Sequence, residues 1–155
     1  MMDLILWRHA EAEELAEAGG DDLARALTSR GEKQAARMAA WLDRQLPEGA
    51  RIFCSPATRC EQTVIAIGRK YKLRDELAPE GDPLDLLQLV QWPDGKSPAV
   101  VVGHQPTLGR VIARLLNLAE EDCSVKKGAL WWLRHRERGS SSQTVVVTVQ
   151  TPELL

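Results

Sequence analysis

Leu4-Ile5-Leu6-Trp7-Arg8-His9 is a short apolar run of strand length that ends abruptly in an arginine and a histidine. A second apolar run, Ala99 to Gly103, ends in the same way and is followed by His104. Open α/β sheets bind ligands at the carboxyl ends of their strands, because the last residue of each strand and the loop after it face the crevice there. If the two runs form neighbouring parallel strands, His9 and His104 converge on one site.

A third strand is predicted over Arg51 to Ser55, and a helix follows it from Ala57. The apolar spacing of this helix predicts a core face of Cys60, Val64, Ile67 and Tyr71. Arg59 lies in the first turn, where a positive side chain is unfavourable beside the positive end of the helix dipole. The position therefore indicates a bound anion next to Arg59. The alternative is a weak surface ion pair of Arg59 with Glu61 or Glu76.

The remaining pattern alternates helices with strands. Thr28 is predicted to cap a helix that Pro47 ends, Asp82-Pro83 opens a short leucine-rich helix, and another helix starts at Thr107. The acidic run from Glu11 to Asp22 is predicted to be a solvated loop or ragged helix. Two antiparallel strands follow, Ala129 to Leu133 and Thr144 to Val149, across the turn Gly139 to Ser142. We therefore expect an α/β fold: a three-layer α/β/α sandwich with a mostly parallel sheet and a C-terminal antiparallel hairpin.

Length and composition limit the class of protein. The 155 residues fit a single domain over 1–155, and the net charge of −2 argues against a general nucleic-acid binder. The cysteines Cys54, Cys60 and Cys123 are odd in number and lack metal-type spacing, which indicates free thiols in a reducing compartment. We find no signal-peptide core and no stretch of transmembrane length, so we expect a cytoplasmic protein without a membrane partner.

Five segments resemble the histidine phosphatase superfamily (phosphoglycerate mutase-like), and within it the small SixA-like phosphohistidine phosphatases. They occur in the family's order over nearly the whole chain: Trp7 to Ala12, Leu27 to Gly31, Ser55 to Thr63, Val102 to Pro106 and Lys127 to Leu130. The resemblance implies that His9 is the catalytic nucleophile, which transiently accepts a phosphoryl group. It also implies that Arg8, Arg59 and His104 surround and bind the phosphoryl oxygens of the substrate.

The chemistry of these residue types agrees with the resemblance. A neutral imidazole is a competent nucleophile near pH 7, and two guanidinium groups can bind phosphoryl oxygens in bidentate fashion. His104, if protonated, adds a third donor. These cations supply the electrostatics that Mg²⁺ supplies in other phosphoryl-transfer sites, so we expect no metal and no other cofactor.

Two departures from the family pattern bear on the substrate. Ala10 stands where many members have glycine, and the acidic proton donor of the larger members has no clear match among Asp75, Glu76 and Glu80. An alcohol leaving group needs a general acid, whereas an imidazole, with a pKa of about 6.5, departs readily once protonated. The missing acid therefore favours a phosphoramidate substrate, and a short chain without a long lid insertion leaves the site open to a histidine on the surface of another protein. We expect a phosphohistidine-bearing protein as the substrate, inorganic phosphate as the product and a monomeric enzyme.

Other functions stay open at this point. The first is a small-molecule phosphomonoesterase, and the second is a phosphate-recognition module that keeps Arg8, Arg59 and His104 but does not turn over. A metal site of His9, His104 and a cysteine is a poorer hypothesis, because no H-x-x-x-H or cysteine pair supplies the usual ligand spacing.

Overall fold

A six-stranded sheet forms the centre of the computed structural model, which describes residues 1–155. The strand order is β3-β2-β4-β1-β5-β6. The strands are β1 (Met2–Arg8), β2 (Arg51–Cys54), β3 (Lys72–Leu73), β4 (Ala99–Gly103), β5 (Leu130–Arg138) and β6 (Ser141–Gln150). The first four are parallel to one another, and β5 and β6 add an antiparallel hairpin. The predicted sheet and its closing hairpin are confirmed.

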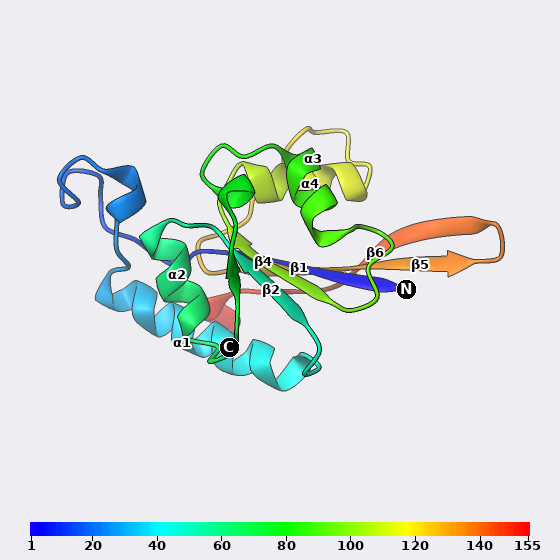
Figure 1. The fold of residues 1–155 in the computed structure, drawn as a ribbon, viewed down its shortest axis with the longest axis horizontal. Helices are drawn as coiled ribbons and strands as arrows, with labels where there is room; N and C mark the ends of the chain where they lie inside the picture. The colour runs from blue at the N-terminus through cyan, green and yellow to red at the C-terminus, as the bar shows by residue number, and fades with distance from the viewer.

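Two helices cover each face of this sheet (Figure 1). On one face lie α1 (Ser29–Gln45) and α2 (Thr58–Ile65), and on the other α3 (Pro83–Val90) and α4 (Thr107–Leu115). Side chains of β1 alternate between the two cores: Ile5 and Trp7 pack with α1 and α2, whereas Leu4 and Leu6 pack with α3 and α4. A parallel strand buried on both faces needs apolar residues at every position, which explains the unbroken apolar run. The structure is the expected three-layer sandwich.

The helix starts follow the predicted caps. Thr28 Oγ1 accepts a hydrogen bond of 3.0 Å from Gly31 N at the start of α1. Asp82 Oδ1 accepts one of 2.8 Å from Leu84 N at the start of α3. Three short 3₁₀ helices complete the elements: η1 (Asp22–Ala24), η2 (Asp75–Leu77) and η3 (Pro152–Leu154). No helix is both long enough and apolar enough to cross a membrane.

Two expectations about element length are wrong. Helix α2 ends at Ile65, so Ile67 and Tyr71 lie beyond the helix, although both pack against the same core. Gly68, at φ 72°, turns the chain away after the helix. The hairpin is longer than expected, because β5 and β6 pair as far as Arg138 and Ser141. Only the first part of β5, Leu130 to His135, pairs with β1, and the remainder of the hairpin projects beyond the sheet (Figure 1).

Candidate active site

The ends of β1 and β4 bring two histidines together. Arg8 and Gly103 are paired in the parallel register of these neighbouring strands, so His9 and His104 follow at the same edge of the sheet. The backbone of His9 is held on both sides: its N–H donates to Gly103 O at 3.2 Å, and its carbonyl accepts from Gly128 N at 2.9 Å. The two imidazole rings lie 5.4 Å apart between centroids and are 5% and 3% exposed. The predicted convergence of the two histidines is confirmed.

One nitrogen of His9 is tied to the backbone. Its Nδ1 lies 2.8 Å from Ala10 O, and because a carbonyl only accepts, Nδ1 carries the proton and Nε2 keeps its lone pair. Ala10 is held in turn by a 3.1 Å hydrogen bond from its N–H to Thr63 Oγ1. Burial lowers the pKa of His9 to about 3, and the charges of Arg8 and Arg59 act in the same direction. Near pH 7 the ring is therefore neutral and presents a nucleophilic Nε2.

His104 is oriented by two side chains. Arg59 Nη2 donates to its Nδ1 at 3.3 Å, so its proton lies on Nε2, which donates to Ser55 Oγ at 2.7 Å. Burial lowers the pKa of His104 to about 3, and the charge of Arg59 contributes. His104 is therefore neutral near pH 7 in the free site, and its role as a third donor requires that it gains a proton when an anion binds. Ser55, at the end of the third predicted strand, is a site residue that the strand pattern does not single out, although it opens the third family segment.

Each arginine of the site is anchored by at least one Nη atom and has a buried Nε atom without a partner. Arg8 Nη1 donates to Val125 O at 2.8 Å, and Arg59 Nη1 donates to Asp22 O at 2.7 Å. The Nε atoms of Arg8 and Arg59 are buried and have no hydrogen-bond partner. A buried unpaired donor is costly, more so on a charged group. Together with the neutral imidazoles, these donors make a site suited to an anion.

The partner of Arg59 is neither of the carboxylates considered in the sequence. Glu61 accepts a hydrogen bond from Tyr71 at 2.8 Å, and Glu76 pairs with Arg74 at 2.8 Å. Arg59 Nη2 instead pairs with Asp22 Oδ2 at 3.1 Å. Asp22, the last residue of the acidic run, starts the short helix η1 and contacts a buried arginine, so at this position the run does more than form the predicted solvated loop or ragged helix. Nothing in the run distinguishes Asp22 from its acidic neighbours, so this role could not be found in the sequence.

The three carboxylates considered as general acids do not contact the site. Asp75, Glu76 and Glu80 make no hydrogen bond to the histidines or to their arginines. Cys60 Sγ lies 3.5 Å from His104 Nε2, but burial raises the pKa of this thiol to about 12, so it is not a thiolate. No group of three or more His, Cys, Asp or Glu side chains gathers in a way that could hold a metal ion.

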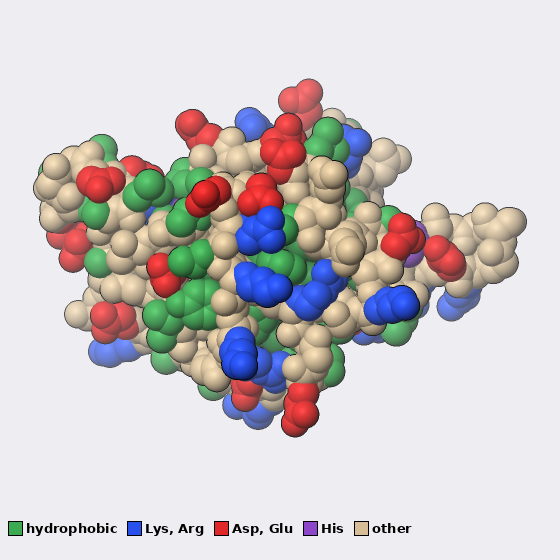
Figure 2. All heavy atoms as spheres, viewed as in Figure 1, with side chains coloured by type: hydrophobic (Ala, Val, Ile, Leu, Met, Phe, Trp, Pro, Cys, Tyr) green, Lys and Arg blue, Asp and Glu red, His purple; other side chains and the backbone are tan.

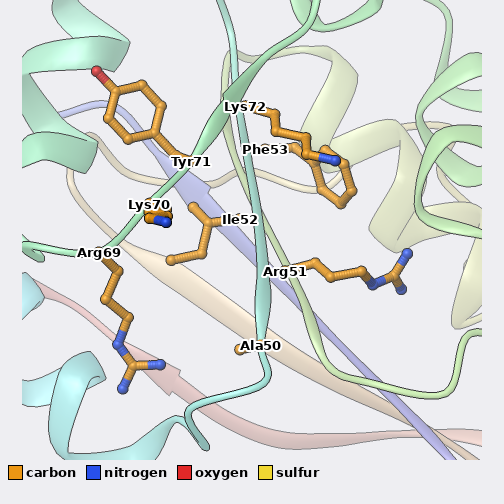
Figure 3. A pocket seen from close by; sticks show the side chains of 8 residues that line it. All are labelled: Ala50, Arg51, Ile52, Phe53, Arg69, Lys70, Tyr71 and Lys72. Atoms are coloured by element: carbon orange, nitrogen blue, oxygen red, sulfur yellow. The ribbon is translucent and has the colours of Figure 1, made fainter.

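A cavity of about 510 Å³ lies elsewhere, between Ala50–Phe53 and Arg69–Lys72 (Figure 3). Lys and Arg side chains gather on this face of the molecule (Figure 2). Its arginines are already engaged: Arg51 donates to Val90 O at 2.9 Å, and Arg69 pairs with Asp43 at 2.7 Å. Because the cavity holds no histidine and no unpartnered buried donor, we place the candidate chemistry at the strand ends rather than here.

Comparisons with known proteins agree with this geometry. The family described as histidine phosphatase superfamily (branch 1) matches residues 4–80. Phosphohistidine phosphatase SixA of Escherichia coli (strain K12) is 31% identical over 122 residues, which cover 74% of each chain. The chain therefore belongs to the histidine phosphatase superfamily. It is a phosphatase of SixA-like type.

Solved structures share the whole fold. A structure of the protein histidine phosphatase SixA complexed with tungstate has a TM-score of 0.81 and 26% identity, with 99% of each chain covered. Phosphoserine phosphatase from Entamoeba histolytica, in complex with 3-phosphoglyceric acid, has a TM-score of 0.76 and 18% identity, with 100% of each chain covered. The fold is thus common to phosphatases that are named for different substrates.

Proposed function

We propose that the protein is a phosphohistidine phosphatase that removes a phosphoryl group from a histidine of another protein through a covalent phosphohistidine on His9. The observation that carries this proposal is the free Nε2 of a neutral His9 beside two buried arginine Nε donors that have no partner. A nucleophile with a lone pair and a cluster of unpaired cationic donors is what attack on a phosphoryl group needs.

The reaction has two displacement steps. His9 Nε2 forms a bond to phosphorus, the bond from phosphorus to the substrate nitrogen breaks, and the substrate imidazole leaves. Water then attacks the phosphoryl group on His9, which releases inorganic phosphate and returns His9 to its neutral form. Arg8 and Arg59 bind the equatorial oxygens through their Nε groups and neutralise the charge that spreads over them. Arg59 Nη2 adds a second contact with the hydrogen that it gives to His104 Nδ1 in the free site, and it keeps its other hydrogen on Asp22.

His104 completes the donor set when an anion binds. A phosphate dianion beside its Nδ1 favours the protonated ring, because an opposite charge raises the pKa of a cationic acid. Nδ1–H then donates to a phosphoryl oxygen, while Nε2–H keeps its hydrogen bond to Ser55 Oγ. Binding of the dianion is therefore coupled to uptake of a proton.

Two observations favour phosphohistidine as the substrate. None of the candidate acids Asp75, Glu76 and Glu80 touches the site, and an imidazole leaving group needs the least help from an acid. The similarity to a relative named phosphohistidine phosphatase points to the same substrate class. A small-molecule phosphomonoesterase is the second candidate, which the fold shared with a phosphoserine phosphatase favours.

Phosphorus NMR on two substrates tests the proposal. The wild-type protein is incubated with a phosphohistidine protein and with a phosphoserine peptide, and the release of inorganic phosphate is followed. We expect faster turnover of phosphohistidine, by roughly the 10²–10⁴-fold that a general acid contributes. His9→Ala should remove turnover, whereas His135→Gln, a change at the third histidine of the chain, should retain it.

Each other outcome contradicts a defined part of the proposal. Preference for phosphoserine would favour the phosphomonoesterase, and turnover by a folded His9→Ala variant would exclude the covalent intermediate. Binding of phosphate without turnover of either substrate would indicate a phosphate-recognition module.

A further inference from the structure

Asp22 reaches the buried site from the solvent side. Its side chain is 46% exposed, whereas that of Arg59, its partner at 3.1 Å, is 4% exposed. The backbone carbonyl of Asp22 also accepts from Arg59 Nη1 at 2.7 Å, so Arg59 stays anchored even without the carboxylate. The backbone contact alone can position Arg59, so the carboxylate of Asp22 is available for a second interaction.

The leaving group departs from the side of phosphorus opposite His9, and Asp22 lies on the solvent side of the site. His9 is buried, with 5% of its surface exposed, and in-line displacement places the leaving group on the side of phosphorus opposite to it. The substrate ring must therefore leave through the solvent side, past the arginine that holds the phosphoryl oxygens. Asp22 is the carboxylate that contacts this arginine.

We propose that Asp22 determines specificity by accepting a hydrogen bond from the second ring nitrogen of the substrate phosphohistidine, which holds that ring in its protonated form. This proposal rests on the proposed function. It explains how a site without a contacting general acid selects a nitrogen leaving group over an oxygen one.

The chemical step balances without a proton transfer. The substrate ring enters with a proton on the nitrogen that does not carry phosphorus, and therefore with a positive charge. When the bond between His9 Nε2 and phosphorus forms, the bond from phosphorus to the ring breaks, and its electron pair stays on the ring nitrogen. The ring leaves as neutral imidazole. A serine oxygen would leave as an alkoxide, and an anionic Asp22 beside it would give no help.

The groups around Asp22 keep it ionised. Arg59 faces it from α2, Arg25 pairs with its Oδ1 at 3.1 Å, and His104 lies within electrostatic range. Partial burial opposes ionisation, but the hydrogen bonds from Arg25 and Arg59 outweigh it and hold the pKa of Asp22 below its usual value. Asp22 is therefore an anion throughout the range in which an imidazole, with a pKa of about 6.5, titrates. A neighbouring anion raises the pKa of the bound ring and extends activity to higher pH.

Asp22→Asn tests the proposal, because it removes the charge but keeps the size of the side chain and the backbone contact to Arg59. We measure kcat and KM between pH 5.5 and 9 on a phosphohistidine protein and on p-nitrophenyl phosphate, whose leaving group needs no proton. For phosphohistidine we expect kcat at pH 8 to fall about tenfold and the alkaline limb to move down by about one pH unit. For p-nitrophenyl phosphate we expect a smaller fall in kcat, from the lost ion pair with Arg59, and no shift of the alkaline limb.

Two further variants complete the experiment. Asp21→Asn is the matched control, because Asp21 caps η1 through Leu23 N at 3.1 Å and contacts neither arginine. It should leave both profiles unchanged. Asp22→Glu, which keeps the charge, should recover part of the activity at pH 8.

The outcomes separate this inference from the proposed function. If Asp22→Asn lowered kcat equally on both substrates and did not shift the alkaline limb, the proposed contact with the substrate ring would be wrong. Asp22 would then act only by positioning Arg59. Failure of the wild-type protein to prefer phosphohistidine would overturn the proposed function itself, whatever the variants do.

Discussion

At the scale of single residues, the site depends on which nitrogen atoms of its arginines are left free. Arg59 holds Asp22 through Nη1 and one hydrogen of Nη2, while its buried Nε has no partner and the other Nη2 hydrogen contacts His104 Nδ1. Arg59→Ala should lower kcat/KM by roughly 10²–10⁴-fold, because two charge-assisted hydrogen bonds are lost at about 1.5–3 kcal/mol each. Arg59→Lys should recover only part of this loss, since an ammonium cannot reproduce the planar fork.

Steady-state kinetics on p-nitrophenyl phosphate measures these losses. Arg69→Lys serves as the control, because Arg69 holds Asp43 and the carboxyl end of α1 and lies outside the site. If Arg59→Lys were as active as the wild-type protein, bidentate contact at this position would be wrong.

At the scale of elements, the first turn of α1 packs directly on the segment that follows His9. Thr28 N donates to Glu11 O at 3.0 Å, and a Cβ atom on Gly31 would overlap the same carbonyl oxygen. Gly31→Ala should therefore destabilise the protein by about 1–3 kcal/mol through overpacking. The direction of the change separates the two effects, because without the overlap alanine would stabilise the helix relative to glycine by about 1 kcal/mol.

Urea unfolding measures the change in the free energy of unfolding. Gly49→Ala is the matched control, because a Cβ atom there meets nothing within 4 Å. We expect that variant to be neutral or slightly stabilised. A Gly31→Ala protein as stable as the wild type would show that α1 can move away from Glu11 at no cost.

At the scale of the whole molecule, packing two neutral histidines inside the fold makes stability depend on pH. Burial lowers the pKa of His9 and of His104 to about 3, below the value of about 6.5 expected in the unfolded chain. The unfolded state therefore binds protons first, so this stability is present above pH 6.5 and is lost as the pH falls toward 3. At pH 5 we expect the free energy of unfolding to be lower than at pH 7 by about 1–4 kcal/mol.

Thermal unfolding between pH 7 and pH 4.5 at constant ionic strength measures this dependence. His104→Asn should lose about half of it, because one of the two titrating rings is gone. Asp22 does not interfere in this window, since its pKa lies below the ordinary carboxyl value and its contribution is lost only at lower pH. Parallel curves for the two proteins would mean that His104 is not the titrating group.

Local patterns in the sequence determined most of the architecture and pointed to the central residues of the candidate site. Unbroken apolar runs defined β1 and β4, Thr28 and Asp82-Pro83 marked helix starts, and the strand ends pointed to His9 and His104. These features depend on neighbours within a few positions along the chain, and such interactions are visible in the order of residues.

Only the tertiary structure decided how these pieces meet. The strand order places β4 beside β1, and folding brings together Asp22 with Arg59 and Ser55 with His104, pairs separated by 37 and 49 positions. The protonation states of the histidines follow from burial and from charges contributed by other elements, so no local pattern could predict them. The sequence by itself therefore determined which groups can carry the chemistry. The fold decided which of them are neutral, which are anchored and which remain free, because those properties depend on contacts between distant parts of the chain.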